Sequence, residues 1–277
     1  MSPELKRRIW SGLVMAAVVL AATWVGGLPF RVLSAAIALL VYFEWSTITK
    51  LTERNYGANL VGWVGIILLS ANIGFGDPDM SMPLLSGLVI TVALMVLISG
   101  GTWWLPGGVL YSGLSGISLA AIRDVGAGGL AAILFVFAVV WSTDILAYFV
   151  GRALKGPKLA PRISPGKTWS GAIGGTVSAI IAGSLVSFWA FGRLSVWVVF
   201  LAFVLSAASQ IGDLFESFIK RRFGVKDSSQ LIPGHGGVMD RVDGLVFACF
   251  AVFLLALVYG PLRGHVGITV ADFIFGL

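Results

Sequence analysis

Apolar residues fill long stretches of the chain, and polar residues are confined to the short segments between them. A helix that crosses the roughly 30 Å hydrocarbon core of a bilayer needs about 20 apolar residues. Stretches of about that length, almost free of charge, are Trp10–Leu28, Phe30–Ile48, Ala58–Phe75, Gly128–Val150, Trp169–Phe191, Ser195–Gly212 and Gly244–Gly260. Each is predicted to be a membrane-spanning helix.

A further stretch, residues 80–122, is about twice as long as one span and carries no charge. It contains the sequence Trp103-Trp104-Leu105-Pro106-Gly107-Gly108. Paired tryptophans favour the membrane interface, and Pro-Gly favours a turn. The stretch therefore predicts two helices with a break at residues 103–108, which brings the prediction to nine spans.

The composition agrees with an all-α polytopic membrane protein. Of the 277 residues, 57% are hydrophobic and 12% are charged, whereas soluble domains are about 25% charged. A soluble domain with one core, a nucleic-acid-binding domain and an intrinsically disordered chain are therefore excluded. The single cysteine, Cys249, cannot form an intrachain disulfide, and two histidines are too few for a typical zinc site.

Basic residues are distributed unevenly between the two sets of loops. The chain has 19 Lys and Arg residues. If the N-terminus is cytoplasmic, all of them lie on the cytoplasmic side except Arg31, Arg123, Arg193 and Arg263. Because cytoplasmic loops retain positive charge, the sequence predicts a cytoplasmic N-terminus and a C-terminus on the outside. Lys6-Arg7-Arg8 and the first span are expected to form an uncleaved anchor.

The first of two polar cytoplasmic segments follows the sixth span, which contains Asp144. An ionised carboxylate inside a span costs about 2.5 kcal/mol or more, so Asp144 is expected to have a cationic partner or to line a polar cavity. The segment ends in Ser164-Pro165-Gly166-Lys167-Thr168, just before a helix. A helix N-terminus beside Lys167 suits phosphate oxygens. A structural ion pair of Asp144 and a solvated basic loop stay open as alternatives.

The second polar segment, residues 212–243, has a more specific pattern. If the eighth span continues as a helix into the cytoplasm, its polar residues share one face. These are Asp213, Glu216, Ser217 and Lys220. Gly224 would end that helix. Asp240 and Asp243 follow three residues apart at the start of the ninth span, where a helix N-terminus favours anions.

The residue types in this second segment predict phosphoryl-transfer chemistry. Carboxylates that converge repel one another unless a cation lies between them, and oxygen ligands without Cys or His select hard cations such as Mg²⁺. The nearby cations suited to phosphate oxygens are Lys220, Arg221, Lys226 and Arg241. Residues 233–237, Pro-Gly-His-Gly-Gly, permit a close backbone approach to a phosphate. A charged linker with ordinary ion pairs is the alternative.

Residues 217–243 resemble the signature of the phosphatidate cytidylyltransferases, also called CDP-diacylglycerol synthases, bacterial type. The resemblance is carried by Ser217-x-x-Lys220-Arg221, Lys226-Asp227, Pro233-x-His235-Gly236-Gly237 and Asp240-Arg241-x-Asp243. Residues 164–168 and 209–217 are also similar to blocks of that family, so the resemblance covers roughly residues 144–243. Ser170 departs from the pattern, because many relatives are expected to carry Gln or Glu there.

The resemblance implies transfer of the cytidylyl group of CTP to phosphatidate, giving CDP-diacylglycerol and pyrophosphate, in the cytoplasmic (inner) membrane. It implies Mg²⁺, with K⁺ beside it in some relatives. The implied metal ligands are Asp144, Asp213, Asp240 and Asp243, and the implied catalytic residues are Asp213, Lys220, Asp240 and Asp243. The implied phosphate- and substrate-binding residues are Ser164, Lys167, Thr168, Ser217, Arg221, Lys226, His235, Gly236, Gly237 and Arg241.

A division of the chain follows from this interpretation. Residues 1–125, with spans one to five, are expected to be a lipid-embedded scaffold. Residues 126–277 are expected to be the catalytic region, with spans six to nine and the cytoplasmic loops 151–168 and 213–243. Because the lipid phosphate already carries a nucleophilic oxyanion, no strong base is required, and His235 is expected to act through its loop.

Two other functions stay open at this point. A nucleotidyltransferase for another lipid phosphate would use the same residues, and a cation-coupled transporter would also have many spans and an intramembrane Asp. Against the transporter, the polar residues gather at the cytoplasmic surface. Nucleic acid is not an expected partner, and small-residue helix faces permit a homodimer. Glu44 is expected to be a helix-packing partner, and His265 and Asp272 are expected to be surface residues.

Overall fold

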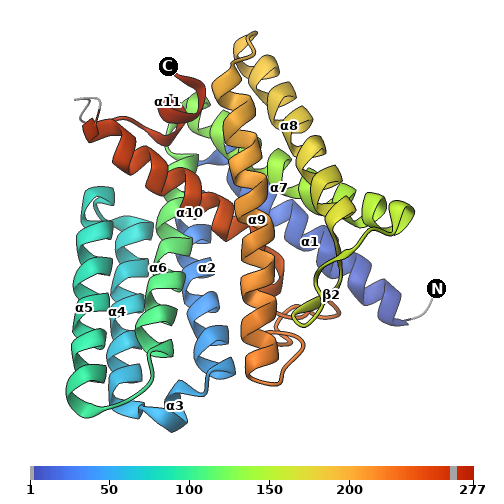
Figure 1. Ribbon diagram of the computed structural model, residues 1–277. Helices are drawn as coiled ribbons and strands as arrows, with labels where there is room; N and C mark the ends of the chain where they lie inside the picture. The colour runs from blue at the N-terminus through green and yellow to red at the C-terminus, as the bar shows by residue number, and fades with distance from the viewer. Residues whose placement is uncertain (1–2, 263–266) are drawn as a thin grey trace. The chain divides into compact units, whose positions relative to one another are not determined.

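A computed structural model gives the structure of residues 3–262 and 267–277, and helices dominate it (Figure 1). The elements are α1 (Pro3–Val25), α2 (Gly27–Ile48), α3 (Leu51–Arg54), α4 (Tyr56–Phe75), η1 (Pro78–Met80), α5 (Ser81–Ser99), α6 (Trp104–Arg123), α7 (Gly126–Leu154), β1 (Lys158–Ala160), β2 (Ser164–Thr168), α8 (Trp169–Phe191), α9 (Val196–Arg222), α10 (Met239–Leu262) and α11 (Val270–Phe275). Arg263 and His265 lie outside the described residues.

The nine predicted spans are confirmed for the part of the chain that the structure describes. Nine helices there are long and apolar enough to cross a membrane, as expected for an all-α polytopic membrane protein. The break in the long apolar run lies at residues 100–103, because α5 ends at Ser99 and α6 begins at Trp104. The predicted break at residues 103–108 is therefore wrong. Pro106 lies in the first turn of α6, where its missing N–H removes no helical hydrogen bond.

The eighth span continues as a helix beyond its apolar stretch, as the pattern of polar residues predicts. Helix α9 extends to Arg222, and the chain then turns at Gly224, whose φ of +73° favours glycine. The small hairpin between α7 and α8 is not predicted by the sequence. In it, Lys158 pairs with Thr168 and Ala160 pairs with Ser164 in antiparallel register. Strands this short leave no readable alternation of polar and apolar residues.

The described chain folds as two compact units. The first comprises the chain up to Ala120 together with Arg222–Arg241, and the second comprises Ala121–Arg221 and the chain from Val242 onward. Residues 222–241, which contain the glycine-rich segment, therefore pack with the N-terminal helices. The functional division expected at residues 125 and 126 stays a prediction.

Aromatic and small residues pack helices α2 and α6 of the first unit against each other. Trp45 of α2 is buried, stacks on Tyr111 of α6 at 5.3 Å between ring centroids, and donates its indole N–H to the Trp104 carbonyl at 2.8 Å. A Cβ atom added to Gly116 of α6 would lie 3.0 Å from the backbone oxygen of Ser34 in α2. These contacts fix the part of α2 that carries Glu44.

Glycines bring α7 and α8 of the second unit into close contact. A Cβ atom added at Gly171 or Gly175 of α8 would lie 2.6 Å from the carbonyl oxygen of Ala147 or Thr143 in α7. Such distances are well inside van der Waals contact, so larger residues would force the two helices apart. The glycine face of α8 therefore positions this helix beside the turn of α7 that carries Asp144.

Candidate active site

A cavity of about 700 Å³ lies in the second unit, and its size suits a nucleotide-sized ligand. Residues of α7, α8, α9, the hairpin and the segment before the hairpin line it. The charged residues among them are Asp144, Arg152, Lys155, Lys158, Lys167 and Asp213. Four cations beside two carboxylates make this cavity suitable for an anion such as a polyphosphate.

The β2–α8 junction positions the residues that were expected at a phosphate. Thr168 is the N-cap of α8, and its hydroxyl oxygen accepts a hydrogen bond from Gly171 N–H at 3.1 Å. The Ser170 hydroxyl accepts a hydrogen bond from Gly156 N–H at 3.2 Å, so the residue that departs from the family pattern links α8 to the preceding loop. The Lys167 ammonium forms an ion pair with the Asp213 carboxylate.

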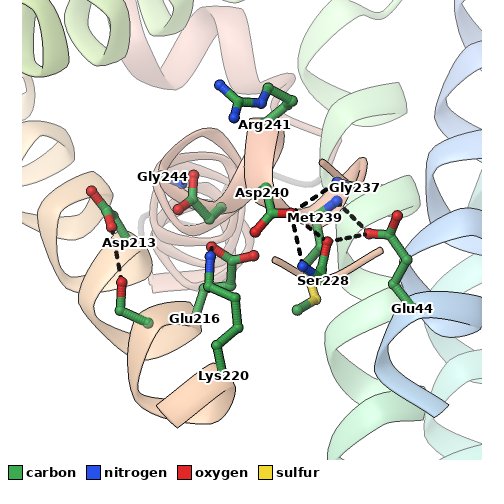
Figure 2. A network of polar contacts seen from close by, with 12 residues as sticks. Glu44, Asp213, Glu216, Lys220, Ser228, Gly237, Met239, Asp240, Arg241 and Gly244 are labelled. Carbon is green, nitrogen blue, oxygen red and sulfur yellow. Dashed lines mark hydrogen bonds and ion pairs between the residues drawn. The ribbon is translucent and has the colours of Figure 1, made fainter. Parts of the chain in front are cut away.

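The C-terminal extension of α9 beyond its apolar stretch presents its polar residues on one face, as predicted. The Ser217 hydroxyl donates to Asp213 Oδ1 at 3.4 Å, and Lys220 Nζ forms an ion pair with Glu216 Oε2 at 3.0 Å (Figure 2). The side chain of Glu216 is almost fully buried, with 2% of its surface exposed. Because a buried carboxylate needs a partner, Lys220 is engaged by Glu216 in this structure.

Glycines also bring α9 and α10 together within the second unit. A Cβ atom added to Gly212 would lie 2.6 Å from the backbone oxygen of Asp243, and one added to Gly244 would lie 3.2 Å from the backbone oxygen of Ser209. This close approach brings Asp243 near Asp213. Asp144, Lys167 and Asp213 all line the cavity described above. The predicted convergence of Asp144, Asp213 and Asp243 on a bound metal ion stays a prediction.

The acids of the second unit offer the ligand chemistry that a hard cation requires. Asp144, Asp213 and Asp243 supply carboxylate oxygens alone, which fits Mg²⁺ and does not fit a soft metal. Within residues 3–262 and 267–277, no group of three or more Asp, Glu, His or Cys side chains is arranged as a finished metal site. Asp213 is paired with Lys167 instead. The carboxylate oxygens are the type of donor that Mg²⁺ prefers. The role of these three residues as ligands stays a prediction.

The glycine-rich segment forms a tight turn in the first unit. Ile232 N–H donates to the Gly236 carbonyl and His235 N–H donates to the Ile232 carbonyl, both at 2.9 Å. Gly234 and Gly236 have φ values of +78° and +84°, which explains why glycine is needed at both positions. Arg241 Nε donates to the His235 carbonyl at 3.0 Å. Arg241 is thereby held against the turn.

The carboxylate of Asp240 supports this turn. Its Oδ2 atom accepts hydrogen bonds at 2.8 Å from Ser228 N–H, the Ser228 hydroxyl and Gly237 N–H (Figure 2). A Cβ atom added to Gly236 would lie 2.8 Å from the same oxygen. The absence of a side chain at Gly236 therefore makes room for a carboxylate of the protein. The predicted roles of Asp240 in catalysis and metal binding stay predictions.

Glu44 of α2 is a member of this network that the sequence analysis missed. Its carboxylate is fully buried and accepts hydrogen bonds from the Ser228 and Ser229 hydroxyls and from the N–H groups of Val238 and Met239. The sequence indicated only an acid near the end of a span. Its partners lie at least 184 residues further along the chain, so no local spacing could have identified them.

The structure divides the predicted residues between the two units. The second unit contains Asp144, Ser164, Lys167, Thr168, Asp213, Ser217, Lys220, Arg221 and Asp243, and the first contains Lys226, His235, Gly236, Gly237, Asp240 and Arg241. Arg221 and Lys226 are exposed. Asp240 and Asp243 are three residues apart on α10, as predicted. The individual roles of these residues stay predictions.

Comparison with known proteins identifies relatives along most of the chain. The family model described as the cytidylyltransferase family matches residues 6–259. A phosphatidate cytidylyltransferase of Brucella abortus biovar 1 (strain 9-941) is 43% identical, over 92% of this chain and 94% of the relative. Proteins of the same name are 34% identical in Bacillus subtilis, over 92% and 98% of the two chains, and 32% identical in Haemophilus influenzae, over 91% and 100%.

These matches confirm the resemblance read from residues 217–243, and they extend it through the N-terminal spans, where the sequence alone gave only apolar stretches. The extent of the match includes both compact units and every predicted site residue. The chain belongs to the cytidylyltransferase family.

Proposed function

We propose that this protein transfers the cytidylyl group of CTP to phosphatidate, giving CDP-diacylglycerol and pyrophosphate, a step of phospholipid biosynthesis. A phosphate oxygen of the lipid attacks the α-phosphorus of CTP. A new P–O bond forms, and the bond between the α-phosphorus and the oxygen that bridges to the β-phosphorus breaks, so pyrophosphate leaves with the electron pair. The names of the relatives support this reaction.

The cavity of the second unit is the observation that carries the proposal. It combines Arg152, Lys155, Lys158 and Lys167 with the carboxylates Asp144 and Asp213 in about 700 Å³. Two anionic substrates repel each other in water, and fixed cations offset that repulsion while they hold the reacting atoms in line. Acids among the cations suit a bound metal ion better than a site for simple anion binding.

The side chains have separate tasks in this proposal. Lys167 leaves Asp213 to bind a phosphate of CTP, and the basic residues around it stabilise the pyrophosphate that departs. Asp144, Asp213 and Asp243 would hold Mg²⁺, with K⁺ as a candidate second ion, and Mg²⁺ when bound would stabilise negative charge on the phosphates. The lipid phosphate is already ionised, so no side chain has to act as a strong base.

The reaction is proposed to occur at the cytoplasmic face of the inner membrane. The distribution of Lys and Arg supports a cytoplasmic N-terminus, which would expose the hairpin loop and residues 223–238 to the cytoplasm. CTP is a cytoplasmic substrate, whereas phosphatidate would enter from the bilayer. Both substrates therefore meet where the polar ends of α7, α8 and α9 leave the apolar region.

The test measures pyrophosphate release by detergent-purified protein. Release is expected to need CTP, phosphatidate and Mg²⁺ together, and to fall by about 100-fold or more in Asp243→Asn, which removes a charge from the predicted metal site. Asp79→Asn is the matched control, because Asp79 is exposed in the turn before α5, and it should retain full activity. Full activity of Asp243→Asn, or release without phosphatidate, would contradict the proposal.

A further inference from the structure

Glu44 lies at the centre of a buried network that links α2 to the segment before α10. Its carboxylate has 0% of its surface exposed. Oε1 accepts hydrogen bonds from Ser229 Oγ at 2.6 Å and from Val238 N–H at 2.8 Å. Oε2 accepts hydrogen bonds from Met239 N–H at 2.6 Å and from Ser228 Oγ at 3.0 Å. Both oxygens are therefore engaged by residues 228–239 (Figure 2).

The location of these donors distinguishes Glu44 from an ordinary helix-packing residue. Val238 and Met239 supply N–H groups at the N-terminus of α10, where no carbonyl of the same helix can accept them. A carboxylate at that position satisfies these donors and interacts favourably with the helix dipole. Glu44 was expected to be a helix-packing partner, and its contact with α10 is a cap on the N-terminus of that helix.

Glu44 also controls the conformation of the segment at both of its ends. It binds Ser228 and Ser229 near the start and Val238 and Met239 at the end. The tight turn at Ile232–Gly236 lies between these two points. Fixing both ends of a short segment removes most of its freedom to move. The orientation of the turn therefore depends on the buried carboxylate of Glu44 in addition to that of Asp240.

The Ser228 hydroxyl couples Glu44 to Asp240. Its oxygen lies 3.0 Å from Glu44 Oε2 and 2.8 Å from Asp240 Oδ2, and Ser228 N–H also donates to Asp240 Oδ2. A hydroxyl has one proton, so it donates to one of the two carboxylates at a time. A displacement of Glu44 would consequently change the hydrogen bonding of Asp240.

We propose that Glu44 is a positioning residue for the reaction, which holds residues 228–239 and the N-terminus of α10 in their active arrangement. The effect of Glu44 on catalysis rests on the proposed function. Its effect on the conformation of residues 228–239 rests on the hydrogen bonds alone. Glu44 contacts no substrate in this proposal. It acts through the turn that contains His235, Gly236 and Gly237, and through Asp240.

The test compares Glu44→Gln with a buried control on the same helix. The Gln side chain has nearly the same shape, but its NH₂ group would face a backbone N–H where an oxygen now accepts, so at least that hydrogen bond is lost. Ser34→Ala is the control, because Ser34 is buried in α2 and donates only to the Phe30 carbonyl of its own helix. A third variant, Ser228→Ala, removes the hydroxyl that links the two carboxylates.

Hydrogen–deuterium exchange of the resting protein is the first measurement, and it requires no activity. In Glu44→Gln, exchange is expected to rise in peptides that cover residues 226–243 and to stay at the wild-type level in peptides from the spans. Ser34→Ala should leave residues 226–243 protected. Unchanged exchange in Glu44→Gln would overturn the inference, and so would an increase spread equally over all spans, because it would indicate a packing role.

Steady-state kinetics is the second measurement. In Glu44→Gln, kcat is expected to fall by about 10- to 100-fold, as for other residues that support a site without contacting substrate. KM for CTP should change far less. The fold-decrease in kcat of the double variant Glu44→Gln/Ser228→Ala should be clearly smaller than the product of the two single decreases, because both substitutions act on one network. Multiplicative losses, or wild-type kcat in Glu44→Gln, would overturn the catalytic part.

The two measurements also separate this inference from the proposed function. If wild-type protein releases no pyrophosphate from CTP and phosphatidate, the proposed function fails. Local loss of protection at residues 226–243 in Glu44→Gln would still establish that Glu44 holds this segment in place.

Discussion

At the scale of single residues, a hydrogen bond to the N-terminal helix α1 fixes the His235 side chain. The Ser11 hydroxyl oxygen lies 2.9 Å from His235 Nδ1, 2.9 Å from the Pro233 carbonyl oxygen and 3.1 Å from the Arg8 carbonyl oxygen. The hydroxyl has one proton, so the tautomer of the ring decides whether Ser11 or His235 donates in the hydrogen bond between them. His235 is therefore part of the structure of its turn.

We expect His235→Gln to retain pyrophosphate release within about 10-fold of wild type, because its amide can also form a hydrogen bond with Ser11, whereas loss of a true general acid or base costs roughly 10²- to 10⁴-fold. The pH dependence of the rate, measured from pH 6 to 9 alongside Ser11→Ala, should keep its shape. A loss of activity in His235→Gln with CTP binding intact would show that the ring itself transfers a proton.

The difference between Glu44 and the other acids shows how far single residues can be predicted from sequence. Asp213 and Asp243 were recognised because they belong to short patterns with helical spacing, and those patterns are local. Glu44 has no such pattern, since its donors come from a segment that is brought to α2 only by folding. Candidate site residues in local patterns are therefore easier to predict from the sequence than residues whose contacts are formed only by folding.

At the scale of elements, the spans were predictable because hydrocarbon imposes a length and a composition on each helix. The helix boundaries were less predictable: a break was expected at residues 103–108, although Pro106 is compatible with the first turn of α6. The hairpin at residues 158–168 escaped prediction because its pairing depends on a short polar loop. The close approaches of α7 to α8 and of α9 to α10 depend on single glycines.

Replacing Gly212 with Ala is expected to destabilise the protein by about 1–3 kcal/mol, because the new Cβ would lie 2.6 Å from the backbone oxygen of Asp243. Thermal unfolding in detergent measures the change. Gly87→Ala is the matched control, since Gly87 is also helical and has no neighbour within 4 Å of an added Cβ. That variant should be neutral or slightly more stable. Equal melting temperatures for the two variants would contradict the proposed close contact.

At the scale of the whole molecule, an odd number of spans requires the two ends of the chain to lie on opposite sides of the membrane. Nine such helices are present in the part of the chain that the structure describes. Their direction is a prediction from the distribution of Lys and Arg. A membrane-impermeant thiol reagent can test it, because Cys249 is fully buried and should not react.

We expect Arg162→Cys, in the exposed turn of the hairpin, to react only in inside-out vesicles. Asp79→Cys, in the exposed turn before α5, should react only from the outer face of intact spheroplasts. The unmodified protein serves as the control in both preparations. Reaction of both variants from the same side would be incompatible with the predicted topology.

The dependence of Glu44 on residues 228–239 also affects how the chain is made. Met239 lies 195 residues after Glu44, and a ribosome that adds 5–20 residues per second needs roughly 10–40 s to synthesise that length. Helix α2 enters the membrane during this interval, before the donors of its carboxylate exist. Until residues 228–239 are synthesised, the Glu44 carboxylate must be hydrated, protonated or bound to a temporary partner. Completion of the first unit is therefore a late event in biogenesis, although most of that unit is synthesised first.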